Sequence, residues 1–338
     1  MVSRARLTIA ESFDVQISER NRRTVRCDRC DEDAVVDQPY QRAHLCDSHF
    51  RASVVERARR ELHRQVPGFR GGTVAVALSG GKDSGVALTL TQLYFSRRPN
   101  VEIIALSVDE GISGYRPATL EKARELTTRL GVEHRIVRFS DAYGTTTEQS
   151  LRTLPGTIPC AYCGVWRRQL LNRAARELSA DVLVLGFNLD DLAQTVLMNL
   201  VRGDLDRLAR MSPHRARQPG LIPRIAPLAH IPEREVFLYA HLLGIPFDHG
   251  ECPHARAATR NLYREVVWQL EEAMPGTRHA LLRTQERLAP LLVEPAGAGV
   301  AERCRECGEP ATGSLCRACE FLSSARNAII MAAASAPL

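Results

Sequence analysis

The stretch VAVALSGGKDS, Val74 to Ser84, decides the fold of this chain. An apolar run of strand length stops abruptly in a cluster of serine, glycine, lysine and aspartate. Gly80 and Gly81 let the backbone approach a phosphate closely. Ser79 and Ser84 add hydroxyl groups, and a helix that begins here presents unpaired N–H groups to an anion. The stretch therefore predicts an anion site at the carboxyl end of a strand.

The basic residue in this cluster is a lysine, which is rare in this protein. Lys82 and Lys122 are the only lysines among 45 basic residues, so arginine supplies the other 43. An ammonium is a compact charge that fits between phosphate oxygens, whereas a guanidinium prefers a flat, bidentate partner. We therefore expect Lys82 to bind phosphate; the alternative is a solvated turn lysine. Because Gly80 and Gly81 are adjacent, the spacing differs from a Walker A loop, and ordinary NTPase or kinase chemistry is not indicated.

The rest of the chain alternates predicted strands and helices. Strands are expected at residues 73–78, 102–108, 132–137 and 181–186, and helices at 50–66, 84–95, 117–130, 165–178 and 190–201. Residues 220–236 add a late strand and a short helix, and 257–290 two helices broken at 274–277. Continuous apolar strands between helices predict an α/β fold with a doubly wound parallel sheet covered on both faces.

Composition bounds the partners and the location of the protein. The net charge of +6 and a pI near 8.9 favour an anionic partner, of which nucleic acid is the commonest. The sequence has no apolar run of membrane-spanning length, and its N-terminus lacks the apolar stretch of a secretion signal. We therefore expect a soluble, cytoplasmic protein with no membrane partner.

Ten cysteines, most of them in closely spaced pairs, indicate metal ligation in a reducing compartment rather than disulfides. Two complete ligand sets predict two structural Zn²⁺ ions, because each C-x-x-C or C-x-x-H turn brings two ligands to one face of a tetrahedral ion. The sets are Cys27, Cys30, Cys46 and His49, and Cys304, Cys307, Cys316 and Cys319. The first could also be an accidental spacing without metal. The expected domains are a flexible extension (1–22), an N-terminal zinc ribbon (23–50), a catalytic domain (51–292) and a C-terminal zinc ribbon (300–325).

The three remaining cysteines are Cys160 and Cys163, just before a predicted helix, and the solitary Cys252. Three thiols leave a metal site one ligand short of a closed cage. An open coordination position is what a site needs in order to hold an exogenous ligand such as sulfide. The alternative is a ribbon-like pair plus an inert buried cysteine.

Three strand ends carry a family resemblance: SGGKDS after the first strand, SVDEG after the second and LGFNLDD after a later one. Together they resemble the PP-loop of the adenine nucleotide alpha hydrolase superfamily, whose members cleave ATP between the α and β phosphates. The resemblance implies that backbone at five residues cradles adenosine, namely Ala77, Leu78, Ser79, Val108 and Gly186. It further implies that ATP phosphates and Mg²⁺ are held by Gly80, Gly81, Lys82, Asp83, Ser84 and Asp191. Capping of a helix N-terminus is the alternative reading of Asp190 and Asp191.

The ordered combination of both ribbons, the PP-loop and the three thiols resembles the tRNA two-thiouridine synthetases, the group of TtuA and the cytosolic thiouridylase catalytic subunit. The likeness spans roughly Cys27 to Cys319, and CGVWRRQLLN, QTVLMNLVRGD and MPGTRHALL favour the wobble-uridine branch. It implies an ATP-dependent sulfurtransferase that adenylates a uridine carbonyl oxygen and replaces it with sulfur. The expected catalytic residues are Lys82, Asp83, Cys160, Cys163 and Cys252. A [4Fe–4S] cluster on the three thiols is preferred to a persulfide, because it employs all three.

The same resemblance implies the partners: tRNA, a sulfur donor that is free sulfide or a thiocarboxylated ubiquitin-like protein, and a second copy in a homodimer. The basic stretches VWRRQLLNR and HRAR are candidates for phosphate contacts or ordinary solvated faces. Phe187 stands where the family has histidine, and Ala229 where it has arginine, so each removes a polar group available to ATP or RNA. The alternatives are a two-thiocytidine enzyme and a zinc-ribbon RNA-binding protein with a vestigial PP-loop.

Overall fold

The computed structural model describes residues 25–154, 156–211, 218–255, 260–292 and 302–334. The chain divides into two compact units, Met1–Phe50 and Arg51–Leu338. The expected extension at 1–22 and the HRAR stretch at 214–217 lie outside the described residues. Within the described part of the chain, none of the helices combines the length and apolar character that a membrane crossing requires.

The N-terminal unit is built on a small antiparallel hairpin. Its strands β1 (Val36–Gln38) and β2 (Ala43–Leu45) are joined by the 3-10 helix η1 (Pro39–Gln41), and Val36 lies opposite Leu45. Helix α2 (Asp47–Gln65) starts immediately after Cys46. It begins three residues earlier than the periodicity predicted, because the polar first turn carries no apolar signal. This early start puts His49 on the helix.

A five-stranded parallel sheet forms the centre of the second unit, in the order β5–β4–β3–β6–β7. The strands are β3 (Gly72–Ala77), β4 (Val101–Asp109), β5 (Glu133–Arg138), β6 (Val182–Val184) and β7 (Arg224–Ile225). The chain steps from β3 to β4 and β5 on one side, then returns to add β6 and β7 on the other. In such a sheet, ligands bind at the carboxyl ends of the two strands where the direction reverses. Those strands are β3 and β6, and the predicted doubly wound α/β fold is confirmed.

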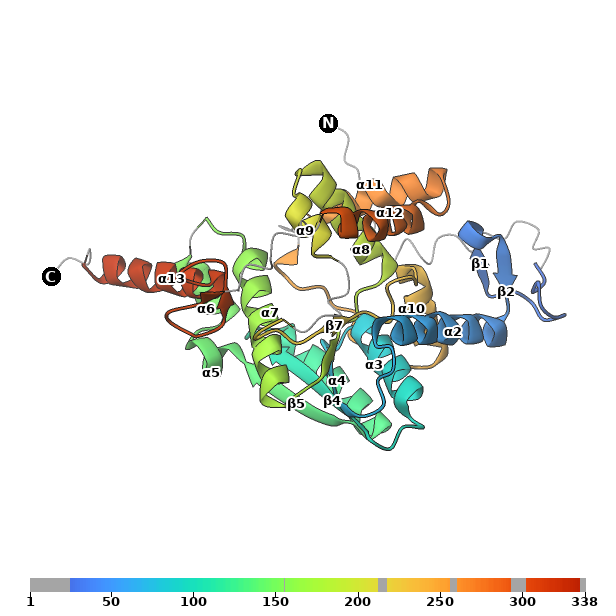
Figure 1. The fold of residues 1–338 in the computed structure, drawn as a ribbon, viewed down its shortest axis with the longest axis horizontal. Helices are drawn as coiled ribbons and strands as arrows, with labels where there is room; N and C mark the ends of the chain where they lie inside the picture. Colours follow the sequence, from blue (N-terminus) through green and yellow to red (C-terminus); the bar gives the residue numbers. More distant parts are fainter. Residues whose placement is uncertain (1–24, 155, 212–217, 256–259, 293–301, 335–338) are drawn as a thin grey trace. The chain divides into compact units, whose positions relative to one another are not determined.

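Helices cover both faces of the sheet (Figure 1). They are α3 (Lys82–Phe95), α4 (Arg116–Leu130), α5 (Phe139–Tyr143), α6 (Thr147–Thr153) and α7 (Pro159–Glu177). Because crossovers between parallel strands are right-handed, α3 and α4 lie on one face and α7, which leads back to β6, lies on the other. Ala75, Leu106 and Val108 point to the α7 face and share one apolar core with Trp166 and Leu170.

A second group of helices follows β6. It comprises α8 (Leu189–Val201), α9 (Leu205–Ala209), α10 (Glu233–Leu242), α11 (Arg260–Ala273) and α12 (Thr277–Leu292). Helices α11 and α12 pack on α8, and α12 also packs on α9 (Figure 1). The predicted break at 274–277 separates α11 from α12. Helix α12 continues through Pro290, where the sequence predicted its end.

The C-terminal ribbon belongs to the second unit and packs on α7. It consists of β8 (Glu302–Arg303), β9 (Pro310–Ala311) and the start of α13 (Arg317–Ala334), a helix that the sequence analysis did not predict. Trp166 Nε1 donates to the Ala318 carbonyl at 3.2 Å, and Arg176 pairs with Glu309. Helix α7 begins at Pro159, so the prediction that Cys160 and Cys163 precede the helix was wrong. Proline at the first helical position, where its missing N–H is not needed, explains the earlier start.

Candidate active site and metal centres

The turn after β3 is held in a conformation that requires glycine. Gly80 has φ of +86°, and a Cβ added to it would lie 1.9 Å from the Thr119 carbonyl oxygen. Ser84 Oγ accepts from the Ser79 N–H at 3.0 Å and donates to the Gly81 carbonyl at 3.0 Å, which closes the turn onto the first turn of α3. The Gly80 N–H has no acceptor among the described residues, which leaves it available to an anion.

Lys82 lies in the first turn of α3 between two carboxylates. Its Nζ is 3.0 Å from Asp83 Oδ2 and 2.7 Å from Glu233 Oε1. Burial would lower the pKa of Lys82, but the charges of Asp83 and Glu233 outweigh it and hold the pKa above its usual range. The ammonium is therefore charged at every physiological pH. An ammonium fixed beside unpaired backbone N–H groups suits a phosphate ligand.

The loop after β6 lies beside the glycine turn. Asn188 Nδ2 donates to Asp83 Oδ1 at 2.9 Å, which ties the two strand ends together. Gly186 packs on the first turn of α3, since a Cβ there would lie 2.9 Å from the Ser84 backbone. Burial, then the charge of Asp83, raises the pKa of Asp191 to about 6. Two carboxylates that repel each other beside a phosphate site favour a bound cation.

The capping interpretation of the aspartate pair holds in part. Asp191 forms a capping box with Asn188, whose Oδ1 accepts from the Asp191 N–H at 3.0 Å. Asp191 Oδ1 also lies 3.4 Å from Arg260 Nη1. Asp190 instead pairs with Arg278 at 3.0 Å and accepts the Glu233 N–H at 2.7 Å. Asp190 therefore holds α10 and α12 in place, whereas Asp191 faces Asp83.

The three thiols outside the ribbons are neighbours. Cys160 and Cys163 lie in the first two turns of α7, and Cys160 Sγ is 3.7 Å from the His254 carbonyl in the turn that Cys252 begins. Burial, then the charge of Cys252, raises the pKa of Cys160, and burial raises the pKa of Cys163 to about 11. All three are free thiols.

The segment that leads to Cys252 is also tied to the glycine turn, because the Asp248 N–H donates to the Gly80 carbonyl at 3.0 Å. This bond brings the thiol-bearing loop to the same end of the sheet as Lys82. The glycine turn and the loop of Cys252 are thus connected by a few residues of backbone.

A buried ion pair lies between the glycine turn and α7. Arg116 Nε is 2.9 Å from Glu110 Oε2, and both side chains are at most 5% exposed. Arg116 Nη1 donates to the Ser79 carbonyl at 2.7 Å. Arg167, one turn beyond Cys163, approaches the other Glu110 oxygen at 3.5 Å.

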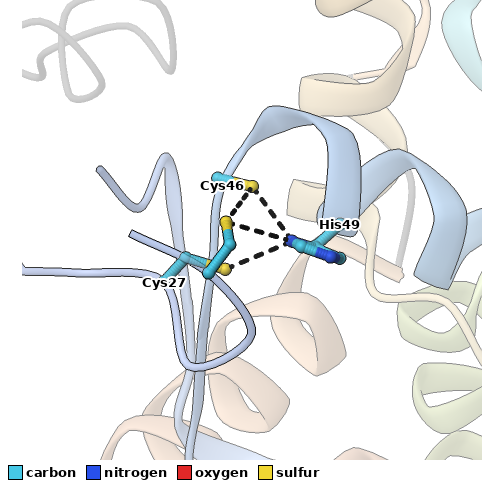
Figure 2. Close-up of side chains that lie close together, drawn as sticks. Cys27, Cys46 and His49 are labelled. Carbon is cyan, nitrogen blue, oxygen red and sulfur yellow. Dashed lines mark hydrogen bonds between the residues drawn. The ribbon is translucent and has the colours of Figure 1, made fainter. Parts of the chain in front are cut away.

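The four predicted ligands of the N-terminal ribbon meet at one point. Figure 2 shows the sulfurs of Cys27 and Cys46 turned toward His49. Cys27 Sγ and Cys46 Sγ lie 3.5 Å and 3.3 Å from His49 Nδ1, and Cys30 Sγ lies 3.6 Å from Cys46 Sγ. Around a tetrahedral zinc ion the sulfurs are about 3.8 Å apart, and sulfur and nitrogen about 3.6 Å. The ligand set therefore fits Zn²⁺.

The C-terminal set has the same compactness, with all four sulfurs within 4.8 Å of one another. Cys307 Sγ and Cys316 Sγ are 3.5 Å apart. Gln169 Nε2, from α7, donates to Cys316 Sγ at 3.3 Å, and its carbonyl accepts from Tyr143 at 3.0 Å. The ribbon is thereby attached to the helix that bears Cys160 and Cys163.

The remaining predicted residues lie at or near strand ends. Ala77 ends β3 and Val108 is the penultimate residue of β4. Leu78 already uses both backbone groups, since its N–H donates to Leu106 and its carbonyl accepts from Ser107. Phe187 is 44% exposed.

Ala229, the other departure from the family pattern, is buried. Sequence reasoning overlooked Glu110, Arg116, Asn188 and Glu233. For Glu110 and Asn188 a signal existed, because they lie within the quoted strand-end motifs SVDEG and LGFNLDD. Arg116 and Glu233 come from helix starts, and nothing in their sequence context marks them.

Comparison with known proteins agrees with this geometry. A family model described as the PP-loop domain matches residues 53–271, and one described as the 2-thiouridine synthetase TtuA N-terminal LIM domain matches residues 26–51. The tRNA 2-thiolation protein NcsA of Haloferax volcanii is 41% identical over 315 residues, which cover 88% of this chain and 98% of the relative. The chain belongs to the PP-loop family of tRNA 2-thiolation proteins.

Further members of this family extend the likeness to eukaryotes and to a solved structure. The cytoplasmic tRNA 2-thiolation protein 1 of Oryza sativa is 33% identical, with 88% of this chain and 82% of the relative covered. The structure of the U34-tRNA thiolase NcsA from Methanococcus maripaludis with its [4Fe–4S] cluster matches with a TM-score of 0.77 and 33% identity. That match covers 88% of this chain and 96% of the other. The predicted family is therefore confirmed.

Proposed function

We propose that this protein is an ATP-dependent tRNA sulfurtransferase that converts uridine 34, the wobble base, to 2-thiouridine. The observation that carries the proposal is the 3.0 Å bond from the Asp248 N–H to the Gly80 carbonyl, because it joins the loop of Cys252 to the glycine turn. Nucleotide activation and sulfur delivery need to occur at one base, so the two sets of groups must adjoin. The names of the archaeal and plant relatives support the same reaction.

The ATP half of the reaction is assigned to the crevice between β3 and β6. The uridine O2 attacks the α-phosphate and pyrophosphate leaves, so the base becomes an adenylate whose later leaving group is AMP. Lys82 and the free Gly80 N–H stabilise the charge that develops on pyrophosphate. Asp83 and Asp191 are the proposed ligands of Mg²⁺. Backbone near Ala77, Leu78, Ser79, Val108 and Gly186 is the proposed adenosine cradle.

The sulfur half is assigned to Cys160, Cys163 and Cys252. The ligand atoms of each ribbon all lie within 4.8 Å of one another, whereas the Sγ atoms of these three described cysteines do not form such a group. A single zinc ion needs that closeness, whereas a [4Fe–4S] cluster binds each thiolate on a different iron. Three neighbouring free thiols therefore fit a cluster with one open iron better than they fit zinc. When bound, the cluster supplies a site for exogenous sulfur; the two ribbons are proposed to hold structural Zn²⁺.

The tRNA is proposed to contact the basic residues beside the thiols. Arg168 makes no ion pair in the described part of the chain, and burial, then the charges of Arg167, Arg224 and Arg207, lowers its pKa. An arginine that lacks an acidic partner and lies among other arginines favours a phosphate ligand. An anticodon loop suits this site, because its bases are unstacked and can enter the crevice.

The test is a reconstituted reaction with anaerobically purified protein, ATP, Mg²⁺, sulfide and tRNA transcripts. Pyrophosphate release and nucleoside mass spectrometry measure the two halves separately. We expect 2-thiouridine at position 34 and about four iron and four sulfide per chain. Lys82→Met should reduce pyrophosphate release by about 100-fold or more, and Cys252→Ser should abolish thiolation. Product as 2-thiocytidine, or no ATP turnover with any tRNA, would refute the proposal.

Lys122→Met is the matched control for the lysine variant. Lys122 is the other lysine of the chain and forms an exposed pair with Glu125 at 2.8 Å on α4. Its removal should leave both measurements unchanged. Replacing sulfide by a thiocarboxylated ubiquitin-like protein identifies the donor, and thiolation without iron would contradict the cluster route. Light scattering tests the proposed homodimer, and the names of the eukaryotic relatives support a cytoplasmic location.

A further inference from the structure

The Glu110–Arg116 ion pair lies between the two halves of the proposed site but belongs to neither. Both side chains are buried, and burying an ion pair is not in itself a reliable source of stability. The pair also makes connections in two directions, through Arg116 to the glycine turn and through Glu110 to Arg167 on α7. A role in positioning explains why charges occupy this place.

Arg116 fixes the direction of the amide that the phosphate would meet. Its Nη1 donates to the Ser79 carbonyl at 2.7 Å, and this carbonyl belongs to the same peptide plane as the Gly80 N–H. In a trans peptide the C=O and N–H bonds point in opposite directions. A guanidinium that holds the carbonyl inward therefore aims the N–H outward. Because glycine at φ of +86° has few steric restraints of its own, this external restraint is needed.

Glu110 extends the same restraint to the thiols. Its second oxygen lies 3.5 Å from Arg167 Nη1, and Arg167 lies one helical turn after Cys163. The Glu110 carbonyl also accepts from the Thr147 N–H at 2.9 Å, at the start of α6, the helix before α7. The carboxylate is thus bonded to the arginine that holds the glycine turn and to the helix that bears two of the three thiols.

We propose that Arg116 and Glu110 are positioning residues: Arg116 aims the Gly80 N–H at the nucleotide phosphate, and Glu110 keeps α7 aligned with that turn. This proposal rests on the proposed function, which it refines. Neither residue touches the reacting atoms. Misplacement of reacting groups by about 1 Å can reduce rates by about 100-fold, so a lost bridge should uncouple adenylation from sulfur transfer.

The experiment compares Arg116→Met with Arg98→Met. Arg98 is a matched control, because its Nη1 likewise donates to a backbone carbonyl, that of Phe69 at 2.8 Å, before the opposite end of β3. Binding of α,β-methylene ATP to the cluster-free protein is measured by calorimetry. Thiouridine formed per pyrophosphate released is measured on the reconstituted protein. We expect Arg116→Met to weaken binding of the ATP analogue about tenfold. It should also lower the amount of thiouridine formed per pyrophosphate released by about tenfold or more.

Two further variants separate the parts of the bridge. Glu110→Gln retains the bond from Arg116 to Ser79, so we expect a smaller loss of ATP-analogue binding than in Arg116→Met. The amount of thiouridine formed per pyrophosphate released should fall by a comparable factor in both variants. Arg116→Lys should partly restore binding, because an ammonium can still donate to the Ser79 carbonyl. If Arg116→Met leaves too little folded protein, because Glu110 is buried without its partner, the charge-neutral double variant Glu110→Gln with Arg116→Met replaces it.

The outcomes distinguish this proposal from the proposed function. Equal values for Arg116→Met and Arg98→Met in both measurements would overturn the positioning role. An unchanged thiouridine ratio in Glu110→Gln would overturn the connection to α7. If the wild-type protein forms no thiouridine, the proposed function fails, while analogue binding still tests how Arg116 positions the turn.

Discussion

Replacing Gly80 with alanine isolates the conformation of the turn after β3. Two effects oppose the alanine side chain. A positive φ costs a non-glycine residue about 1–2 kcal/mol, and overpacking against immovable neighbours about 1–3 kcal/mol. The neighbour here is immovable, since the Thr119 carbonyl at 1.9 Å is backbone within α4. We therefore expect Gly80→Ala to lower the free energy of unfolding by about 2–5 kcal/mol.

Gly81→Ala is the natural control, one residue away. Gly81 has φ of −90°, and the nearest atom to an added Cβ is Ser79 Oγ at 3.5 Å, an ordinary contact. Alanine at this helix N-cap should change the free energy of unfolding by less than about 1 kcal/mol. Urea titration of the nucleotide-free, zinc-loaded protein, followed by circular dichroism, compares the two variants. Equal losses in Gly80→Ala and Gly81→Ala would refute the reasoning about the turn.

Three further predictions follow from the charges and the ribbon. The pKa of Asp191 is raised from 3.8 to about 6, so the folded state binds this proton more tightly than the unfolded state does. The stability of the wild-type protein should therefore fall as pH rises through that interval. Asp191→Asn should have a higher melting temperature than wild type at pH 7 but not at pH 4. Glu233→Gln removes a partner of the Lys82 ammonium, which lies 2.7 Å away, and calorimetry should show tighter α,β-methylene ATP binding by about tenfold. Cys316→Ser should remove the proposed zinc ion of the C-terminal ribbon, as measured by metal analysis, and lower the free energy of unfolding by about 4 kcal/mol or more. Cys307→Ser changes a more exposed member of the same proposed ligand set and should give the same metal loss.

The sequence allowed the sheet to be predicted because its strands are short apolar runs that end in turn-forming residues. Val74 to Ser84 combined both signals. The start of α7 was missed for a physical reason. Tyr162 is the only large side chain among residues 159–164, so the periodic apolar pattern begins only later, although Pro159 indicated a helix start.

The two compact ligand sets could be predicted because tetrahedral metal coordination imposes a spacing on the sequence. The pairing of Lys82 with Glu233 could not be predicted, since Glu233 is 151 residues away and reaches Lys82 only when α10 packs beside α3. The role of Arg116 could not be predicted from the sequence either, because no neighbouring residue indicates that its side chain donates to the Ser79 carbonyl. Long-range contacts between charged side chains depend on the packed fold and leave no periodic pattern.

The attachment of the C-terminal ribbon to α7 has a consequence for biosynthesis. Trp166 and Gln169 form their bonds with Ala318 and Cys316, which leave the ribosome about 150 residues later. Until that end of the chain has emerged, the helix that bears Cys160 and Cys163 lacks one wall of its core. The thiols thus gain their final setting only after the C-terminal ribbon has been synthesised, and nascent or truncated chains lack it.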